Sequence, residues 1–390
     1  MKTWTAAAAL STLLMTGPAS AQQCGGDFGQ WLSVIRSEAT AAGVGERGLG
    51  ALDGARIDDR VLQRDRAQGV FTQTFVEFSG RMINAHRLQQ GAANLQRYAA
   101  VFERAEREFG VPGPVIAAFW ALETDFGAVQ GDFNTLNALV TLAHDCRRPE
   151  IFRPQVVPLL QLIDSGDLPA DVQGAWAGEI GQMQMLPSDI LTKGIDGDGD
   201  GHVDVRRSAP DAILTTAAKI QSRGWRAGEP WMLEVTIPAS LPWERTGRIN
   251  RLPLSQWAEW GVTKRDGSPL GAGPEAGLAL PMGHKGPAFL VFPNFDVYLE
   301  WNQSIIYTLT AANLATRLAG EPKFDPRNAE AGLSGETMKL LQRKLEALGH
   351  DVGKVDGILG AMTREAVRNE QLRLGLPADG WPTQQLLQAL

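Results

Sequence analysis

The stretch VPGPVIAAFWALETDFG, residues 111–127, decides the fold and places one carboxylate among large apolar side chains. Its apolar residues recur at helical spacing, a proline suits the first turn and a glycine follows as a stop, so it predicts a helix that contains Glu123. The residues three or four positions away share one face with Glu123: Phe119, Trp120 and Phe126. Such apolar surroundings raise a carboxyl pKa, as a general acid requires. The alternative from this stretch alone is a glutamate near a helix end that reaches water.

The first 21 residues have the pattern of a secretory signal peptide, with a basic residue, an apolar run and the small residues 19–21. The run is too short for an ordinary membrane span, so we expect an exported, periplasmic protein that is cleaved near Ala21. The residues before Cys24 lack the small-residue pattern of a lipidated cysteine, which argues against lipoprotein anchoring. Cys24 and Cys146 are the only cysteines, and an oxidising compartment permits them to pair. Two free buried thiols are the alternative.

The composition is that of a globular protein with one large core and a smaller satellite domain. The chain has 390 residues, of which 44% are hydrophobic and 21% charged, and its formal net charge is −7. This acidic balance is unlike that of a generic nucleic-acid binder, so we expect no nucleic-acid partner. The sequence has no Gly-x-Ser-x-Gly elbow, phosphate-cradling loop, His-Glu-x-x-His helix or paired Cys-x-x-Cys motifs. We therefore expect acid–base chemistry on a carboxylate and no organic cofactor.

Helical periodicity dominates the chain from residue 28 to residue 319. The clearest predicted helices cover residues 94–109, 134–144, 150–163, a segment that starts at a serine cap at 208 and runs towards 224, and 295–318. Between residues 224 and 293, glycines, prolines and short strand-like runs such as 231–237 predict a loop-rich region or a small β insertion. Five tryptophans lie there, and their rings are suited both to core packing and to stacking on sugars.

The segment GEIGQMQMLPS, residues 178–188, is a second motif with chemical content. Its closely spaced glycines permit close backbone approach, and its two glutamines supply amide donors and acceptors. Such a loop either lines a polar groove or forms a buried turn whose glutamines serve neighbouring backbone groups. The residues alone leave both interpretations open.

The segment DGDGDGHVD, residues 196–204, reproduces the first part of a calcium-binding loop. Aspartates stand at positions one, three, five and nine, glycine stands at position six, and His202 offers its backbone carbonyl at position seven. Arg207 stands where the usual glutamate closes the loop, and Asp211 follows a few residues later as a replacement. The alternative is an acidic surface turn.

In this order and spacing, the motifs resemble those of the membrane-bound lytic murein transglycosylase B family over residues 28–319. The resemblance implies a mainly α, lysozyme-like domain with a small β insertion. The family's single catalytic acid stands in a Trp-x-x-Glu-Thr-x-x-Gly helix, which makes Glu123 the catalytic residue. The resemblance also implies substrate binding by Gln184 and a structural Ca²⁺ site, whose implied ligands are Asp196, Asp198, Asp200, His202 and Asp211. This chain has one extra residue before Asp211.

A third family segment, with the pattern Tyr-Asn-x-Ser-x-x-Tyr, matches residues 301–307. It implies that substrate also contacts Trp301, Asn302, Ser304 and Tyr307. Trp301 replaces a tyrosine, which keeps an aromatic ring for stacking on sugar but loses a hydroxyl.

The C-terminal part of the chain predicts a separate module. Residues 320–332 have the turn formers and charge of a linker, and residues 333–390 predict three short helices at 340–345, 363–374 and 383–390. The module's Gly and Asp turns resemble those of a three-helix peptidoglycan-binding domain. The predicted organisation is thus a signal peptide (1–21), a catalytic domain (22–319), a linker (320–332) and a wall-binding domain (333–390). A tethered anchor raises the enzyme's effective concentration at its substrate.

The resemblance implies an enzyme that cleaves the β-1,4 bond between N-acetylmuramic acid and N-acetylglucosamine in peptidoglycan strands and leaves a 1,6-anhydro end. A hydrolytic muramidase that combines Glu123 with a second carboxylate, Glu179, is the alternative enzyme. A non-catalytic peptidoglycan-binding scaffold is an alternative of a different class. We expect a monomer.

Overall fold

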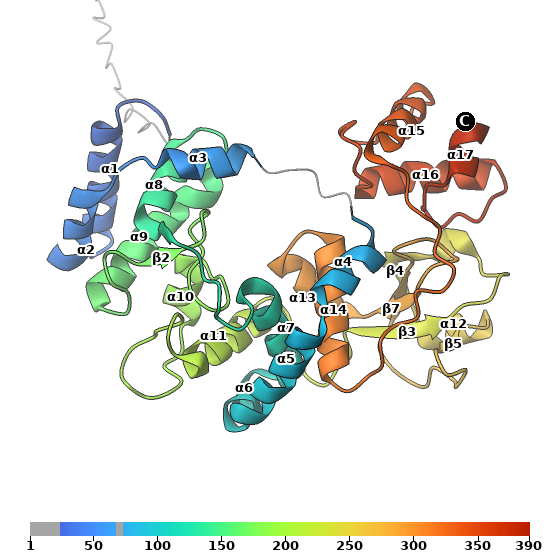
Figure 1. Cartoon of the computed structure of the whole chain (residues 1–390), viewed down its shortest axis with the longest axis horizontal. Coiled ribbons are helices and arrows are strands. Elements are labelled where there is room, and N and C mark those ends of the chain that lie inside the picture. Colours follow the sequence, from blue (N-terminus) through green and yellow to red (C-terminus); the bar gives the residue numbers. More distant parts are fainter. Residues whose placement is uncertain (1–23, 68–72) are drawn as a thin grey trace, which may run out of the picture.

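The computed structural model describes residues 24–67 and 73–390, which form an elongated, mainly helical molecule (Figure 1). The prediction of a mainly α fold with a small β insertion is confirmed. The predicted signal peptide, residues 1–21, lies outside the described residues. Among the helices that the structure describes, none has both the length and the apolar character that a membrane crossing requires.

A helical lobe forms the N-terminal end of the molecule (Figure 1). It contains α1 (Phe28–Ala41), α2 (Glu46–Ala51), the short helix Leu52–Gly54, α3 (Asp59–Arg66), α8 (Thr135–His144) and α9 (Pro149–Ser165). Strands β1 (Phe133–Asn134) and β2 (Gln173–Gly174) pair antiparallel. A disulfide joins Cys24 to Cys146, so the structure contains the paired alternative for the two cysteines.

The centre of the molecule is built around α7, which carries Glu123. The other central helices are α4 (Phe75–Met82), α5 (Ala85–Arg97), α6 (Ala99–Phe109), α10 (Pro187–Lys193), α11 (Ala209–Ser222), α13 (Pro293–Trp301) and α14 (Ile305–Leu318). Helix α7 (Gly113–Thr124) packs against α5, α6, α11 and α14, and every residue except Pro114 and Glu123 is buried. An all-round apolar sequence explains this position because such a helix has no face for water.

The predicted helix at 111–127 is confirmed, but it ends three residues before Gly127. Asp125 and Phe126 adopt left-handed backbone conformations, with φ of 53° and 60°. The Asp125 carboxylate accepts a hydrogen bond from Arg87 Nε of α5 at 2.9 Å. This ion pair and the Thr124 hydroxyl, which accepts the Gly127 N–H at 2.8 Å, fix the turn directly after Glu123.

Two predicted helices are wrong because each is broken in the structure. The segment 94–109 is divided at Tyr98, which ends α5 and begins α6, and the Tyr98 ring packs against Trp120 of α7. The segment 295–318 is divided at Asn302, which has extended backbone. There the Asn302 side chain accepts the Ser304 N–H at 2.9 Å, and the Ser304 hydroxyl caps α14. Asn and Ser favour such local bonds over helix continuation.

The small β insertion is a five-stranded antiparallel sheet in the order β4-β6-β7-β3-β5. Its strands are β3 (Met232–Thr236), β4 (Gly247–Leu252), β5 (Thr263–Lys264), β6 (Ala276–Ala279) and β7 (Phe289–Val291). The helix α12 (Leu254–Glu259) and the short helix Trp243–Arg245 lie between strands. Trp257 is fully buried in the insertion's own apolar core, which shows the core-packing role for one of the five tryptophans.

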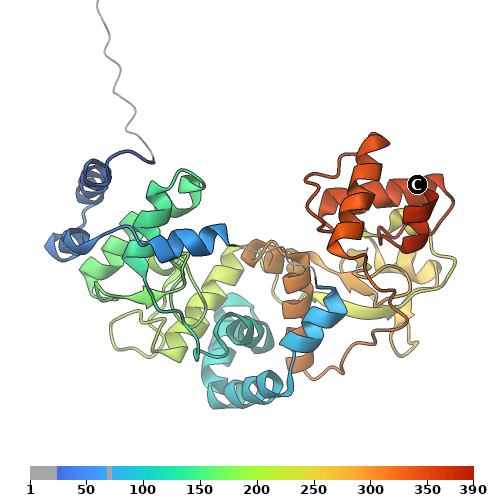
Figure 2. The same ribbon diagram turned by 45° about the horizontal axis from the view of Figure 1, so that its top comes forward.

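Three helices form the C-terminal module, as predicted: α15 (Gly335–Ala347), α16 (Ala361–Arg373) and α17 (Gln384–Ala389). The module packs against the β insertion in both ribbon views (Figures 1 and 2). Asp379 accepts the backbone N–H of His284 at 2.8 Å, and Arg364 donates to the Pro281 carbonyl at 2.8 Å. Arg368 donates to the Thr246 carbonyl. The module is therefore docked on the insertion rather than loosely tethered.

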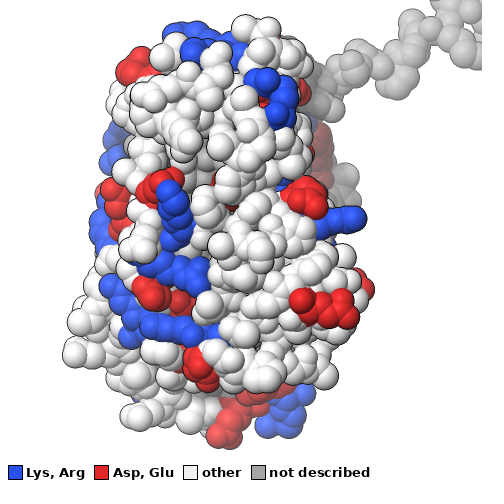
Figure 3. Space-filling view, turned by 90° about the vertical axis from the view of Figure 1, so that its right-hand side faces the viewer, with Lys and Arg blue, Asp and Glu red and all other residues white. Residues whose placement is uncertain are grey.

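The end of the molecule that carries the module has a mixed surface. Figure 3 shows basic and acidic side chains interspersed among uncharged ones on this face. This pattern agrees with the modest net charge of the chain, −7.

Replacing Gly283 by alanine is expected to undock the module. Gly283 has φ of +71°, and an added Cβ would lie 2.7 Å from both Asp379 Oδ2 and Trp381 Cβ. G271A is the matched control, because Gly271 has φ of +77° but open space around it. We expect G283A to lower the free energy of unfolding by about 1–3 kcal/mol more than G271A does. Urea unfolding measures the difference; equal losses in the two variants would contradict the docking account.

Candidate active site

Glu123 lies where α7, α13 and α14 meet, and two donors hold its carboxylate. Its Oε1 atom accepts a hydrogen bond from the Trp301 indole Nε1–H at 2.9 Å. The same oxygen accepts a short hydrogen bond from the Tyr307 hydroxyl. The structure thus brings two residues of the 301–307 segment directly onto Glu123, although the sequence assigned them only to substrate contact.

The environment of Glu123 shifts the pKa of its carboxyl group upwards, in the direction that suits a general acid. Burial raises the pKa of Glu123, while the hydrogen bonds from Tyr307 and Trp301 and the charge of Lys219 act in the opposite direction. The side chain keeps partial access to solvent. The alternative from the sequence was a glutamate near a helix end that reaches water. In the structure, two side chains of the protein donate hydrogen bonds to its carboxyl group. Burial also raises the pKa of Tyr307 well above its ordinary value, so this hydroxyl acts as a donor.

The aromatic neighbours of Glu123 divide into two groups. Phe119 stacks on Trp301, with ring centroids 4.4 Å apart, and on Tyr298, with centroids 5.0 Å apart. Trp120 instead contacts Phe126 edge-on, with centroids 5.6 Å apart. Of the three predicted neighbours, Phe119 therefore supports the indole that donates to Glu123.

Lys219 is a functional candidate that the sequence analysis missed. It lies on α11, is only 8% exposed, and its Nζ is 2.9 Å from Asp189 Oδ2. The same Nζ lies over the Trp301 ring, 4.2 Å from the ring centroid. The available signal was a single lysine within the apolar run of the helix at 209–222, a position where a charge is costly unless it is paired.

The Gln184 loop is tied to the end of α7, because the Thr124 hydroxyl donates to the Gln182 carbonyl at 2.6 Å. Gln184 has left-handed backbone, with φ of 48°, and its side chain is partly exposed. Its amide Nε2 donates to the Gly181 carbonyl at 3.0 Å and to the Gln130 carbonyl at 3.3 Å. The side-chain amide of Gln184 thus donates to backbone carbonyl groups, as the alternative of a buried turn requires. Substrate binding by Gln184 stays a prediction.

The remaining residues of the 301–307 segment shape the backbone in this structure. Asn302 and Ser304 form the turn and cap between α13 and α14 that places Trp301 and Tyr307 on the same carboxylate. Substrate contact by Asn302 and Ser304 stays a prediction.

Glu179 is the second acidic group near Glu123. Burial raises the pKa of Glu179, and the negative charge of Glu123 raises it further. Glu179 thus shares with Glu123 a pKa that burial raises.

The acidic loop after α10 brings three of the five predicted metal ligands together. Carboxylate oxygens of Asp196, Asp198 and Asp211 lie within 4.8 Å of one another. The Asp200 side chain instead accepts the His202 N–H at 2.9 Å, and the His202 ring lies 3.3 Å from Asp167.

The donor chemistry of this loop suits a hard cation. Asp211 is buried and accepts backbone N–H groups from Gly197 at 2.9 Å and Asp204 at 2.7 Å. Asp196 accepts those of Gly199 and Gly201. Three converging carboxylates held in this way fit Ca²⁺, which takes oxygen ligands.

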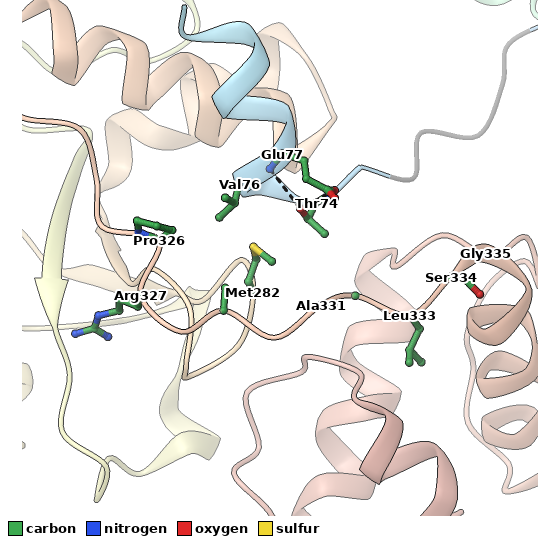
Figure 4. A pocket seen from close by; sticks show the side chains of 12 residues that line it. Thr74, Val76, Glu77, Met282, Pro326, Arg327, Ala331, Leu333, Ser334 and Gly335 are labelled. Carbon is green, nitrogen blue, oxygen red and sulfur yellow. Dashed lines mark hydrogen bonds between the residues drawn. The ribbon is translucent and has the colours of Figure 1, made fainter.

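An open cavity of about 600 Å³ is lined by residues other than those around Glu123 (Figure 4). Its lining comes from α4, from Met282 of the β insertion and from residues 326–335, which lead into the module. Glu123 and its two donors are not among the lining residues.

Two family models match the chain. The transglycosylase SLT domain matches residues 27–316, and the putative peptidoglycan binding domain matches residues 334–390. The membrane-bound lytic murein transglycosylase B of Escherichia coli (strain K12) is 29% identical over 248 residues, which is 63% of this chain and 67% of that protein.

Solved structures agree with the family models. SltB3 from Pseudomonas aeruginosa in complex with NAG-anhNAM-pentapeptide is 36% identical, with a TM-score of 0.86 over 94% of this chain and 99% of that chain. The Escherichia coli lytic transglycosylase Slt35 in complex with calcium is 28% identical, with a TM-score of 0.64 over 78% of this chain and 98% of that chain. The chain belongs to the transglycosylase SLT domain family and carries a C-terminal peptidoglycan-binding domain.

Proposed function

We propose that Glu123 is the single general acid and base of this peptidoglycan lytic transglycosylase. Membership of the family supports the activity, and a relative's structure with NAG-anhNAM-pentapeptide supports the substrate class. The observation that carries the residue assignment is one partly buried carboxyl group held by two donors, Trp301 and Tyr307. In the proposed reaction the β-1,4 bond between N-acetylmuramic acid and N-acetylglucosamine is cleaved without water.

The proposed reaction has two proton transfers on one group. Glu123 first gives its proton to the glycosidic oxygen, and the bond from that oxygen to C1 of the muramic acid breaks. The C6 hydroxyl of the same sugar then attacks C1 and returns its proton to Glu123, which leaves a 1,6-anhydro end. The donors Trp301 and Tyr307 favour the carboxylate that exists between the two transfers, because both bonds are stronger to an anion.

A hydrolytic muramidase would need a second carboxylate to activate water or to attack the sugar. Glu179 is the candidate, but burial and the charge of Glu123 both raise its pKa. A raised carboxyl pKa is also typical of general bases, so the choice between the two reactions rests on the relatives. The family model and the relative's structure with NAG-anhNAM-pentapeptide favour the transglycosylase reaction over hydrolysis.

Digestion of purified sacculi tests the proposed function. We expect the wild-type protein to solubilise them and to release anhydro-muropeptides, which mass spectrometry identifies. A protein that sediments with sacculi but never solubilises them would support the scaffold alternative.

The proposed site of action is the periplasm, after removal of residues 1–21. The disulfide between Cys24 and Cys146 supports export, since such bonds persist in oxidising compartments. We further propose that residues 22–319 form the catalytic domain and residues 333–390 the wall-binding domain, with a 320–332 connection. Glycan strands of peptidoglycan are the proposed partner, and the monomer stays a prediction.

We propose a structural Ca²⁺ ion at the acidic loop, held by Asp196, Asp198 and Asp211 with the His202 carbonyl as a further oxygen. It would offset two of the three negative charges of these carboxylates and tie the loop to the start of α11. Asp200 completes the predicted set without joining the cluster.

Calcium is expected to raise the stability of the folded protein. At a hundredfold excess of Ca²⁺ over its dissociation constant, the free energy of unfolding should rise by about 2.7 kcal/mol. Urea unfolding with Ca²⁺ and with a chelator measures this difference. We expect D198N to abolish it, while D171N, at an exposed aspartate, keeps it. Equal stability of the wild type in both conditions would contradict the proposed site.

A further inference from the structure

The indole that donates to Glu123 is itself held by a buried ion pair. Lys219 on α11 forms this pair with Asp189 on α10, with Nζ and Oδ2 2.9 Å apart. The side chains of both residues are largely buried, with 11% and 15% exposure. Such a pair in the interior is costly to desolvate, so a gain in stability is a weak explanation for it.

The position of the lysine ammonium connects the pair to the site. Its Nζ lies 4.2 Å from the centroid of the Trp301 ring, within the distance at which a cation is attracted by an aromatic face. Phe119 stacks on the same indole at 4.4 Å. The indole N–H then reaches Glu123 Oε1 at 2.9 Å.

We propose that Lys219, anchored by Asp189, is a positioning residue that acts on Glu123 through the Trp301 indole. A cation over the ring draws electron density from it and makes its N–H a better donor to the carboxylate. The ion pair also fixes the plane of the indole, so that the donor stays aimed at Oε1. This inference rests on the proposed function, since it assigns a role relative to Glu123.

The positive charge of Lys219 has a second, direct effect. Burial raises the pKa of Glu123, and the Tyr307 and Trp301 hydrogen bonds and the Lys219 charge lower it. The polar groups that face Glu123 are Tyr307 from α14, Trp301 from α13, Lys219 from α11 and Glu179 from the loop before α10. Removing the lysine charge removes one of the influences that favour the carboxylate, so Glu123 should hold its proton to higher pH.

Three variants separate this role from a structural one. K219M removes the charge but keeps a long side chain, and K219R keeps the charge. R223M is the matched control, because Arg223 directly follows α11, about one turn beyond Lys219, and lies 3.8 Å from Asp189 with its side chain 44% exposed. The measurement is the pH profile of kcat and KM on a soluble, uncross-linked peptidoglycan strand.

We expect K219M to lower kcat roughly tenfold, the factor that corresponds to losing an interaction of cation–π strength, with little change in KM. The alkaline limb of the pH profile of kcat should move to higher pH in K219M, because Glu123 stays protonated to a higher pH. K219R should have the same alkaline limb in its pH profile of kcat as the wild type, and R223M should match the wild type in both kcat and KM. A folded K219M protein whose alkaline limb coincides with that of the wild type would overturn the inference.

Two further variants separate a failure to fold, and a failure of the proposed function, from a failure of the inference about Lys219. If K219M does not fold, the double variant K219M/D189N, which removes both charges of the pair, is judged by the same shift. E123Q in the same assay separates the two proposals. Activity retained by E123Q would overturn the proposed function, whereas an inactive E123Q with an unshifted K219M profile would overturn only the role of Lys219.

Discussion

E123Q is expected to lower the rate of anhydro-muropeptide release by about a thousandfold, within the range that general acid–base catalysis contributes. The amide matches the carboxyl group in shape and still offers Oε1 to the Trp301 and Tyr307 donors. It has no acidic proton for the glycosidic oxygen and cannot accept one from the C6 hydroxyl. Both steps of the proposed reaction are therefore lost at once. Initial rates on sacculi, followed by chromatography of the released products, measure the loss.

Two controls make this result specific to catalysis. E123Q should sediment with sacculi as well as the wild type does, since the C-terminal module is unchanged. E179Q should retain most of the wild-type rate, because Glu179 has no chemical step in the proposed reaction. A fall of less than tenfold in E123Q, or an equal fall in E179Q, would contradict the assignment of a single acid and base.

Y307F is expected to lower kcat by about a hundredfold, as removal of one preorganised donor does in other active sites. The Tyr307 hydroxyl bonds to Glu123 Oε1, and a bond to the charged form holds down the pKa of the carboxyl group. Without this hydrogen bond, fewer interactions counteract the effect of burial, so the pKa of Glu123 rises further. The alkaline limb of the pH–rate profile should consequently move to higher pH. Steady-state rates across a pH series test both effects.

The neighbouring tyrosine supplies a matched control. Tyr298 is buried and stacks on Phe119, but its hydroxyl has no hydrogen-bond partner among the residues that the structure describes. Y298F therefore removes an oxygen that makes no bond, and we expect wild-type rates and equal or higher stability. Similar kinetic losses in Y298F and Y307F would mean that the aromatic packing, and not the donor, carries the effect.

Most of the fold was predictable because hydrophobic periodicity is a local property. The helices at 134–144 and 150–163, the capped helix after Ser208 and the three helices of the module all carry their own signal. The breaks at Tyr98 and Asn302 were not predicted, since apolar residues continue at helical spacing through both. At this break the side chains of Asn302 and Ser304 accept hydrogen bonds from the backbone N–H groups of Ser304 and Tyr307, and periodicity does not register such bonds.

The parts of the site that were predictable are those with a signal in the local sequence. Glu123 stood out as a carboxylate inside an apolar helix, and the resemblance pointed to Trp301 and Tyr307. Their convergence on one oxygen depends on how α7, α13 and α14 pack, which no local pattern contains. Lys219 escaped notice for the same reason, because its partners Asp189 and Trp301 lie 30 positions before it and 82 positions after it.

The source of the oxygen in the product distinguishes attack by the sugar's own hydroxyl from attack by water. The wild-type protein is allowed to cleave a defined glycan strand in water enriched in heavy oxygen, and mass spectrometry then measures the new muramic acid ends. We expect anhydro ends without heavy oxygen, because the sugar's own C6 hydroxyl attacks C1 and Glu123 returns to its starting state. Reducing ends that carry heavy oxygen would contradict this expectation, and would show that the enzyme activates water.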